Sequence, residues 1–162
     1  MPTAGDAGAG VPRTTRGALG SVMVVLSTAA LGIALYLTWT KLQGQAPACG
    51  IIHGCAAVEE SEYSEFLGIP VAAYGSGATA MTLAASFSWW RRADPRALYA
   101  VYGLGLISLL ALAYLAYLEV AVIHAVCIWC VSFTILIGLV WVIATYVLYR
   151  RSRRPEVGPP DE

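Results

Sequence analysis

Charged side chains are scarce in this sequence. Asp, Glu, Lys and Arg make up only 12% of its 162 residues, whereas they make up about a quarter of an ordinary soluble domain. Hydrophobic residues account for 58%, and the mean hydropathy is +0.67. This composition excludes an ordinary soluble domain, and we interpret the chain as a membrane protein in contact with lipid. The net charge of zero gives no sign of a nucleic-acid partner, and we expect none.

Four apolar stretches are long enough to cross a bilayer, whose hydrocarbon core of about 30 Å takes roughly 20 helical residues. They lie at 18–39, 71–90, 97–122 and 126–149. The sequence therefore predicts an all-α fold, an integral membrane four-helix bundle over residues 18–149. We expect residues 1–17 to be a disordered cytoplasmic tail and residues 150–162 to be a basic cytoplasmic tail.

Lysine is almost absent, and the placement of the basic residues sets an orientation. Nine of the ten precede the first stretch, join the second to the third, or follow the fourth, which leaves Lys41 alone on the other side. By the positive-inside rule both termini are cytoplasmic, and the loop 41–70 and the turn at His124 face outward. In a bacterium the outward side is the periplasm or the cell exterior, and in a eukaryote it is the lumen; both permit disulfides. The cysteines on this side are Cys49, Cys55, Cys127 and Cys130.

The pair Cys127 and Cys130 opens the fourth stretch with a Cys-x-x-Cys spacing. Two thiols at this spacing can join without much backbone movement, and the positive end of the helix dipole favours a thiolate. The pattern is typical of a redox centre. Two inert buried cysteines and half of a zinc site are the alternatives.

A second cysteine pair, Cys49 and Cys55, lies in the outward loop with two glycines between them, which allow the tight turns that bring two thiols together. All four cysteines could instead hold zinc or copper. A zinc ribbon usually repeats the short spacing twice, whereas one pair here has five intervening residues. We therefore favour redox chemistry and expect no metal. A purely structural bundle would not need four cysteines on one side.

After the second pair, residues 58–67 mix apolar side chains with four carboxylates. This mixture predicts a short amphipathic helix that caps the outer end of the bundle. A solvated acidic loop is the alternative. Two further polar residues border the membrane near Cys127. Glu119 is the only acid within a predicted span and suggests a functional role, and His124 is a candidate proton carrier.

These motifs together resemble the bacterial branch of the vitamin K epoxide reductase family of membrane thiol oxidoreductases. The resemblance extends from the first helix to the fourth. It rests on the two cysteine pairs, the Ser-x-Tyr-Ser-x-Phe-Leu-Gly-Ile-Pro run at 61–70, and the Tyr-Leu-Ala-Tyr run at 114–117. No single motif is specific, but their order and spacing are.

The resemblance implies a path for electrons. Cys49 would accept them from a reduced thioredoxin-fold protein, and Cys55 would relay them to Cys127 by disulfide exchange. Cys130 would engage the quinone ring. Ser61 matches a family position that supports the loop over the pocket, and Tyr63 and Phe66 belong to the same lid. The candidate quinone contacts, besides Cys130, are Tyr114, Glu119, His124 and Thr134.

The chain also departs from the family's vertebrate members. Thr134 stands where they have a tyrosine that contacts the quinone, and the chain has no asparagine at all, so their quinone-binding asparagine is missing. We therefore expect a respiratory quinone, ubiquinone or menaquinone, as the acceptor. Reduction of vitamin K quinone or its epoxide is the alternative reaction. A DsbB-like generator is a further alternative, but its Cys-x-x-Cys lies in the first outward loop.

Many bacterial members carry a fused thioredoxin domain, whereas this sequence continues after the fourth stretch only with a basic, proline-rich segment. We therefore expect the partner to be a separate DsbA-like protein. The predicted activity is a quinone-dependent thiol–disulfide oxidoreductase that reoxidises this partner and supports disulfide formation in exported proteins. An oxidant of the DsbA type has a potential near −120 mV, so its electrons need a stronger acceptor, such as a membrane quinone.

Overall fold

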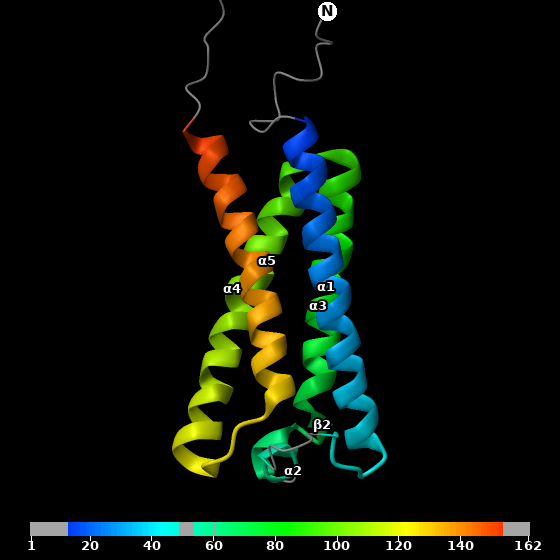
Figure 1. Cartoon of the computed structure of the whole chain (residues 1–162), viewed down its shortest axis with the longest axis vertical. Coiled ribbons are helices and arrows are strands. Elements are labelled where there is room, and N and C mark those ends of the chain that lie inside the picture. Colours follow the sequence, from blue (N-terminus) through cyan, green and yellow to red (C-terminus); the bar gives the residue numbers. More distant parts are fainter. Residues whose placement is uncertain (1–12, 49–53, 60, 154–162) are drawn as a thin grey trace, which may run out of the picture.

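Four long helices run side by side in the computed structural model, which describes residues 13–48, 54–59 and 61–153 (Figure 1). Within these ranges α1 packs against α3 and α5, and α4 packs against the same two helices. The four helices are α1 (Arg13–Leu42), α3 (Val71–Arg92), α4 (Pro95–Leu118) and α5 (Ile128–Ser152).

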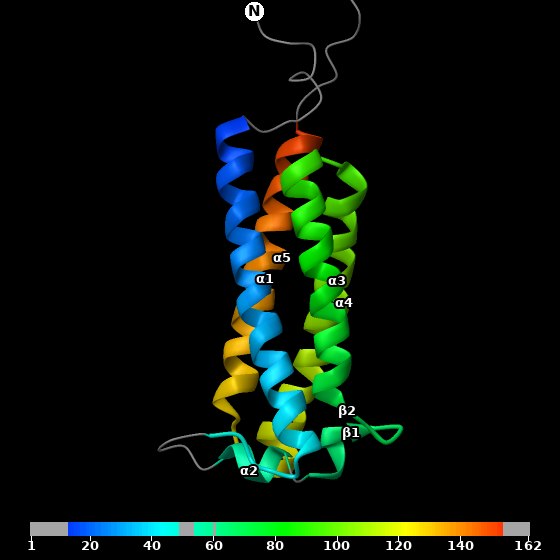
Figure 2. The same ribbon diagram turned by 90° about the vertical axis from the view of Figure 1, so that its right-hand side faces the viewer.

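The shorter elements gather at one end of this bundle (Figures 1 and 2). We call it the cysteine end. The opposite end, where α1 begins, α5 ends and α3 turns into α4, carries the eight described arginines, and we call it the arginine end. These are Arg13, Arg16, Arg91, Arg92, Arg96, Arg150, Arg151 and Arg153. The elements of the cysteine end are α2 (Gly54–Glu59), the 3₁₀ turn η1 (Glu62–Ser64), β1 (Glu65–Phe66), β2 (Ile69–Pro70) and the π-helical turn η2 (Glu119–Ile123).

Three stretches of the described chain are long and apolar enough to cross a membrane. They are Thr14–Leu42, Pro95–Ile123 and Ile128–Ser152. The mainly helical membrane architecture predicted from hydropathy is thereby confirmed. The helix α3 is not among the three, although it has 22 residues, because small and hydroxyl-bearing side chains lower its mean hydropathy.

Close packing between the long helices depends on glycine. At Gly105 of α4, an added Cβ atom would lie 2.9 Å from Cδ1 of Trp141 in α5, and at Gly20 of α1 it would lie 2.5 Å from Cδ1 of Trp90 in α3. The indole rings therefore occupy the space that a side chain would need. The turn between α3 and α4 ends with Asp94, whose carboxylate accepts a hydrogen bond from the Arg96 N–H at 2.9 Å and caps α4.

The helix ends differ from the predicted ones by a few residues. The helix α1 begins at Arg13, so residues 13–17, which the sequence placed in the tail, form its first turns. The helix α5 begins at Ile128, two residues later than predicted, with Cys127 as its N-cap residue. Residues 1–12 and 154–162 lie outside the described part of the chain.

The predicted cap over residues 58–67 takes another form. A short helix is present in the loop, but it lies earlier, at Gly54–Glu59, and a 3₁₀ turn and a two-stranded antiparallel hairpin follow it. Hydroxyl groups account for the interruption. The Ser61 hydroxyl donates to the Val58 carbonyl oxygen at 2.7 Å, and the Ser64 hydroxyl donates to the Ser61 carbonyl oxygen at 2.8 Å. Such local bonds compete with a continuous helix.

Candidate active site

Cys127 and Cys130 lie at the cysteine end, where the chain enters α5. Cys127 is the N-cap residue with an extended backbone, and its carbonyl oxygen accepts the first helical hydrogen bond, from the Val131 N–H at 3.1 Å. Cys130 follows one turn into the helix, on the same face. Both are free thiols; Cys127 is 1% exposed and Cys130 is partly buried. The chain therefore places a reduced thiol pair at the start of a helix.

The neighbouring Cys130 thiol activates the Cys127 thiol. Its pKa is lowered from the ordinary value of 9.0 to about 7, chiefly by a hydrogen bond from the Cys130 thiol. Burial opposes this change, the Cys130 and Trp129 backbone N–H groups support it, and the nearby Glu119 carboxyl weakly opposes it. A substantial fraction of Cys127 is therefore a thiolate at neutral pH, the form that attacks disulfides.

Glu119 approaches this pair from the end of α4. It begins the π-helical turn η2, and its carbonyl oxygen accepts hydrogen bonds from the His124 and Ala125 N–H groups, the second at 3.0 Å. This wide turn leaves the Glu119 side chain buried, with its Oε2 atom accepting the Cys127 N–H at 3.3 Å. Single π-helical turns inside helices are frequent at functional sites.

The second cysteine pair is only partly within the described residues. Cys55 lies in α2, is 1% exposed and is disulfide-bonded. The helix α2 contacts both α5 and η2, so it lies beside the elements that carry Cys130 and Glu119. Cys49 falls outside the described residues. The structure thus combines an oxidised Cys55 with a reduced pair at Cys127 and Cys130.

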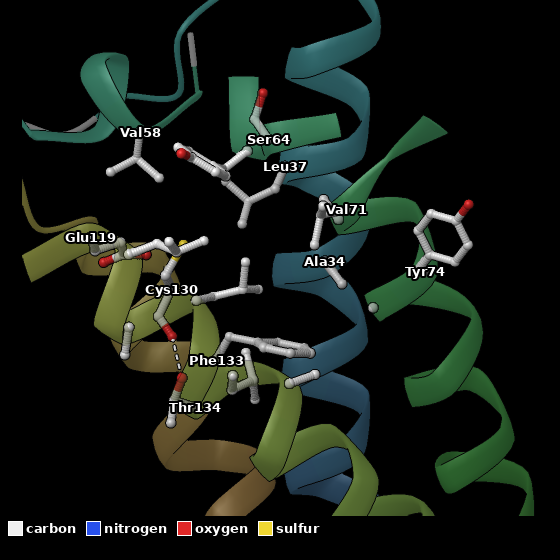
Figure 3. Close-up of a pocket in the computed structure, with 18 of the residues that line it drawn as sticks. Ala34, Leu37, Val58, Ser64, Val71, Tyr74, Glu119, Cys130, Phe133 and Thr134 are labelled. Carbon is white, nitrogen blue, oxygen red and sulfur yellow. Dashed lines mark hydrogen bonds between the residues drawn. The ribbon is translucent and has the colours of Figure 1, made fainter. Parts of the chain in front are cut away.

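A largely apolar cavity of about 460 Å³ lies next to Cys130 (Figure 3). This volume is within the range of small-molecule binding pockets. All four long helices contribute to its wall, and η1 and the end of α2 cover it at the cysteine end. Among the described lining residues Glu119 is the only one with a carboxyl group. Further lining residues that Figure 3 labels are Ala34, Leu37, Val58, Ser64, Val71 and Phe133.

Several of the predicted contacts do line this cavity. Thr134 does so with its hydroxyl donating to the Cys130 carbonyl oxygen at 2.8 Å. Ser61 and Tyr63 line it from the loop above. Phe66 does not: it is 61% exposed and packs edge-on against Tyr74, with ring centroids 6.1 Å apart.

Tyr114 and His124, both predicted to contact a quinone, do not line the cavity. Tyr114 is 61% exposed on the outer surface of α4, because its position on the helix points it away from the bundle. His124 is exposed as well; its backbone is left-handed, with φ of 57°, and its Nδ1 atom lies 3.2 Å from the Val122 carbonyl oxygen. The left-handed backbone, which ends the π-helical turn, directs this side chain away from the cavity.

The loop over the cavity is tied to α1. The Lys41 ammonium group donates to the Ser64 hydroxyl at 2.7 Å and lies 3.5 Å from a Glu65 carboxylate oxygen. Ser64 in turn bonds to the Ser61 carbonyl oxygen. Lys41, predicted as the lone basic residue of the outer side, therefore holds the lid segment in place.

Two aromatic residues that the sequence did not single out fix the entry to the cysteine loop. The Tyr36 hydroxyl accepts the Ala48 N–H at 3.0 Å, and the Trp129 Nε1–H donates to the Ala48 carbonyl oxygen at 3.0 Å. Their rings pack against each other with centroids 5.1 Å apart. Trp129 stands between Cys127 and Cys130 in the sequence, and this position could have identified it. No local sequence feature indicated a role for Tyr36. Ala48, directly before Cys49, is thus attached to the start of α5.

Metal ligands do not gather here in the described part of the chain: no three side chains of His, Cys, Asp or Glu come together there as they would around a metal ion. The features that do converge are a free thiol pair, a buried carboxyl group and an apolar cavity.

Comparison with known proteins identifies the family. The model of the vitamin K epoxide reductase family matches residues 21–145, from the third turn of α1 through most of α5. No curated protein matches the chain. The family match covers most of the sequence and includes both cysteine pairs, which confirms the resemblance inferred from their spacing. The chain therefore belongs to the vitamin K epoxide reductase family, and it is a membrane oxidoreductase.

Proposed function

We propose that this protein is a quinone-linked thiol–disulfide oxidoreductase. It would take electrons from a DsbA-like thioredoxin-fold protein and deliver them to a membrane quinone, and so support disulfide formation in exported proteins. The observation that carries the proposal is the reduced, activated pair of Cys127 and Cys130 beside an apolar cavity, with the disulfide-bonded Cys55 on the neighbouring helix α2.

The relay begins with the outer cysteine pair. The chain has four cysteines, and we propose Cys49 as the disulfide partner of Cys55. A thiolate of the reduced partner attacks this disulfide at Cys49, and the partner leaves as its own disulfide. The freed Cys55 thiolate then attacks the disulfide of the inner pair at Cys127, which restores the outer disulfide and reduces the inner pair. The observed combination of an oxidised Cys55 and a free inner pair corresponds to the state after this transfer.

The inner pair then needs an acceptor, and a quinone accepts two electrons and two protons. The residues that would hold it are those of the cavity, with Cys130, Thr134 and Tyr63 as its polar neighbours. The apolar wall suits an isoprenoid quinone drawn from the membrane. Because Thr134 replaces the tyrosine of the vertebrate members, a respiratory quinone, ubiquinone or menaquinone, fits this site better than vitamin K epoxide.

The orientation follows from the two ends of the bundle. The eight described arginines cluster at one end, which we assign to the cytoplasm by the positive-inside rule. The cysteine end then faces the outside of the cell membrane, where the partner is found. In this arrangement α3 is the fourth membrane-spanning helix, since it runs alongside the three apolar ones.

The test supplies purified protein with a reduced thioredoxin-fold substrate and a soluble quinone analogue, and follows the quinone absorbance. We expect turnover by the wild type and none by Cys130→Ser, with Val142→Ala, an exposed position of α5 that does not line the cavity, as a control. A folded wild type that does not reduce the quinone would overturn the proposal. The same assay with vitamin K epoxide in place of the quinone tests the alternative reaction, which is reduction of the epoxide.

The order of the relay has its own test. In Cys55→Ala the Cys49 thiol has no disulfide partner, so the thioredoxin-fold protein is supplied with one active-site cysteine removed and the other activated by thionitrobenzoate. Attack by Cys49 releases thionitrobenzoate, and the mixed disulfide should accumulate because no second cysteine of the outer pair or of the partner can resolve it. Peptide mapping by mass spectrometry should find it at Cys49. Capture at Cys127 would contradict the relay order.

A further inference from the structure

The inner cysteine pair must lose a proton inside the protein whenever it is oxidised. With Cys127 as the thiolate, formation of the disulfide releases the proton of the Cys130 thiol together with two electrons. Before the reaction this proton is hydrogen-bonded to the Cys127 sulfur. Once the Cys127 sulfur bonds to Cys130 it can no longer accept the proton, so another acceptor is required.

Glu119 is placed to be that acceptor. Glu119 and Cys130 both line the cavity, and Figure 3 draws their two side chains next to each other. The Glu119 Oε2 atom accepts the Cys127 N–H at 3.3 Å, which fixes the carboxyl group over the pair. The side chain is 7% exposed, and among the described residues that line the cavity no other has a carboxyl group.

The other titratable side chain considered for this role lies elsewhere. His124 is exposed, with its ring near the Val122 carbonyl oxygen, and it does not line the cavity. The left-handed backbone of His124 and the carboxyl position of Glu119 both result from the same π-helical turn. This turn therefore brings the acid to the cavity and excludes the imidazole from it.

We propose that Glu119 is a catalytic residue that carries the proton: its carboxylate takes the proton of the Cys130 thiol as the disulfide forms and delivers it to an oxygen of the quinone being reduced. The inference rests on the proposed function.

The atoms and electrons balance. The bond that forms is Cys127 Sγ to Cys130 Sγ, and the bond that breaks is the S–H bond of Cys130. The two electrons go to the quinone. The quinone takes up two protons. One comes from Cys130 through Glu119. The other comes from the outer solvent and balances the proton that Cys127 released to the solvent when it became a thiolate. Glu119 ends each cycle as it began, as a carboxylate.

Two substitutions separate proton transfer from positioning. Glu119→Gln keeps an oxygen that can accept the Cys127 N–H but cannot carry a proton, whereas Glu119→Asp keeps the carboxyl group on a shorter side chain. With the pre-reduced protein and a soluble quinone analogue, we expect Glu119→Gln to slow a single turnover roughly 100-fold, a typical loss for a missing acid–base group. Glu119→Asp should recover most of the rate.

A second readout needs no quinone. When ferricyanide, which accepts electrons but no protons, oxidises the reduced inner pair, the time-resolved infrared difference spectrum should transiently gain the carbonyl band of a protonated carboxyl group, and this band should be missing in Glu119→Gln. Deuterium oxide should shift it.

Two results would overturn the assignment: a Glu119→Gln rate within twofold of the wild type, or the same carboxyl band in that variant. If Glu119→Gln does not fold, the infrared measurement is made on Glu119→Asp, and the absence of the carboxyl band there would overturn the assignment. A wild type that gains the band but does not reduce quinone would refute the proposed function and leave the proton acceptor standing.

Discussion

At the scale of single residues, the reactivity of Cys127 follows from its neighbours. The hydrogen bond from the Cys130 thiol is the largest influence on its pKa, and burial works against it. Trp129, between the two, does not act on the sulfur through its ring; the ring is bonded to Ala48 instead. Within one helical turn, Cys130 thus activates the nucleophile Cys127, whereas Trp129 attaches the cysteine loop.

The alkylation rate of Cys127 should depend on pH with a midpoint near 7. Because the pKa is lowered, the thiolate is already populated above pH 7 and is lost as the pH falls below it. Cys130→Ala removes the hydrogen bond from the thiol and should move the midpoint toward 9.0, while Cys130→Ser, which keeps a donor, should move it less.

Iodoacetamide alkylation followed by mass spectrometry, in a background with Cys49 and Cys55 replaced by serine, measures this midpoint. An equal midpoint in Cys130→Ala and the wild type would contradict the assigned cause.

The attachment of Ala48 can be tested separately. Trp129→Phe keeps a ring beside Tyr36 but loses the donor to the Ala48 carbonyl oxygen, and Tyr36→Phe loses the acceptor for its N–H. Each should cost about 1 kcal/mol of stability, the net value of one hydrogen bond.

We also expect slower transfer from the thioredoxin-fold partner, and unchanged quinone reduction by the pre-reduced inner pair, because only the outer loop is released. Thermal unfolding and the two rates measure these effects. Equal slowing of both rates would show that the attachment serves the inner pair instead.

At the scale of helices and turns, packing depends on where each glycine lies. An added Cβ atom at Gly105 meets the Trp141 ring, whereas at Gly103, on the same helix, nothing lies within 4 Å. The two positions therefore form a matched pair for testing the contact between α4 and α5.

Gly105→Ala should destabilise the protein by about 1–3 kcal/mol, as overpacking does. Gly103→Ala should be neutral or stabilising by up to about 1 kcal/mol, because alanine favours a helix. Thermal unfolding in detergent measures both. Equal unfolding temperatures for the two variants would contradict this prediction. They would show that the α4–α5 contact adjusts to the added methyl group.

At the scale of the whole molecule, the arginines lie at one end of the bundle, and the elements that carry the described cysteines lie at the other (Figure 2). Nine arginines in the sequence and a single lysine make the two ends unequal. Since each arginine resists transfer across a bilayer, one orientation in the membrane is favoured for the whole chain.

Single cysteines introduced at exposed positions report this orientation. In a cysteine-free background, Gln45→Cys marks the cysteine end and Ser152→Cys the arginine end. A membrane-impermeant maleimide added to intact cells should label the first alone, and permeabilised cells should show label on both. Labelling of Ser152→Cys in intact cells would reverse the proposed topology.

Much of the fold could be predicted because the hydropathy and length of each segment can be calculated from the sequence without knowledge of tertiary contacts. Apolar stretches marked the four long helices, and the helix ends were wrong by only a few residues, since caps such as Asp94 and Cys127 decide them locally. The loop after Cys55 was harder. Its carboxylates and apolar residues fitted a helix, but the hydroxyls of Ser61 and Ser64 bind nearby carbonyl oxygens and interrupt it.

The sequence by itself determined the membrane class, the family and the cysteine motifs, because composition and spacing are properties of the chain alone. Only the tertiary structure decided which side chains meet the cavity. Glu119 and His124 are five residues apart, yet one π-helical turn brings the first to Cys127 and leaves the second exposed. Tyr36 and Trp129 come together across 93 positions through helix packing. Contacts between helices depend on how each helix is rotated, and local sequence does not encode that rotation.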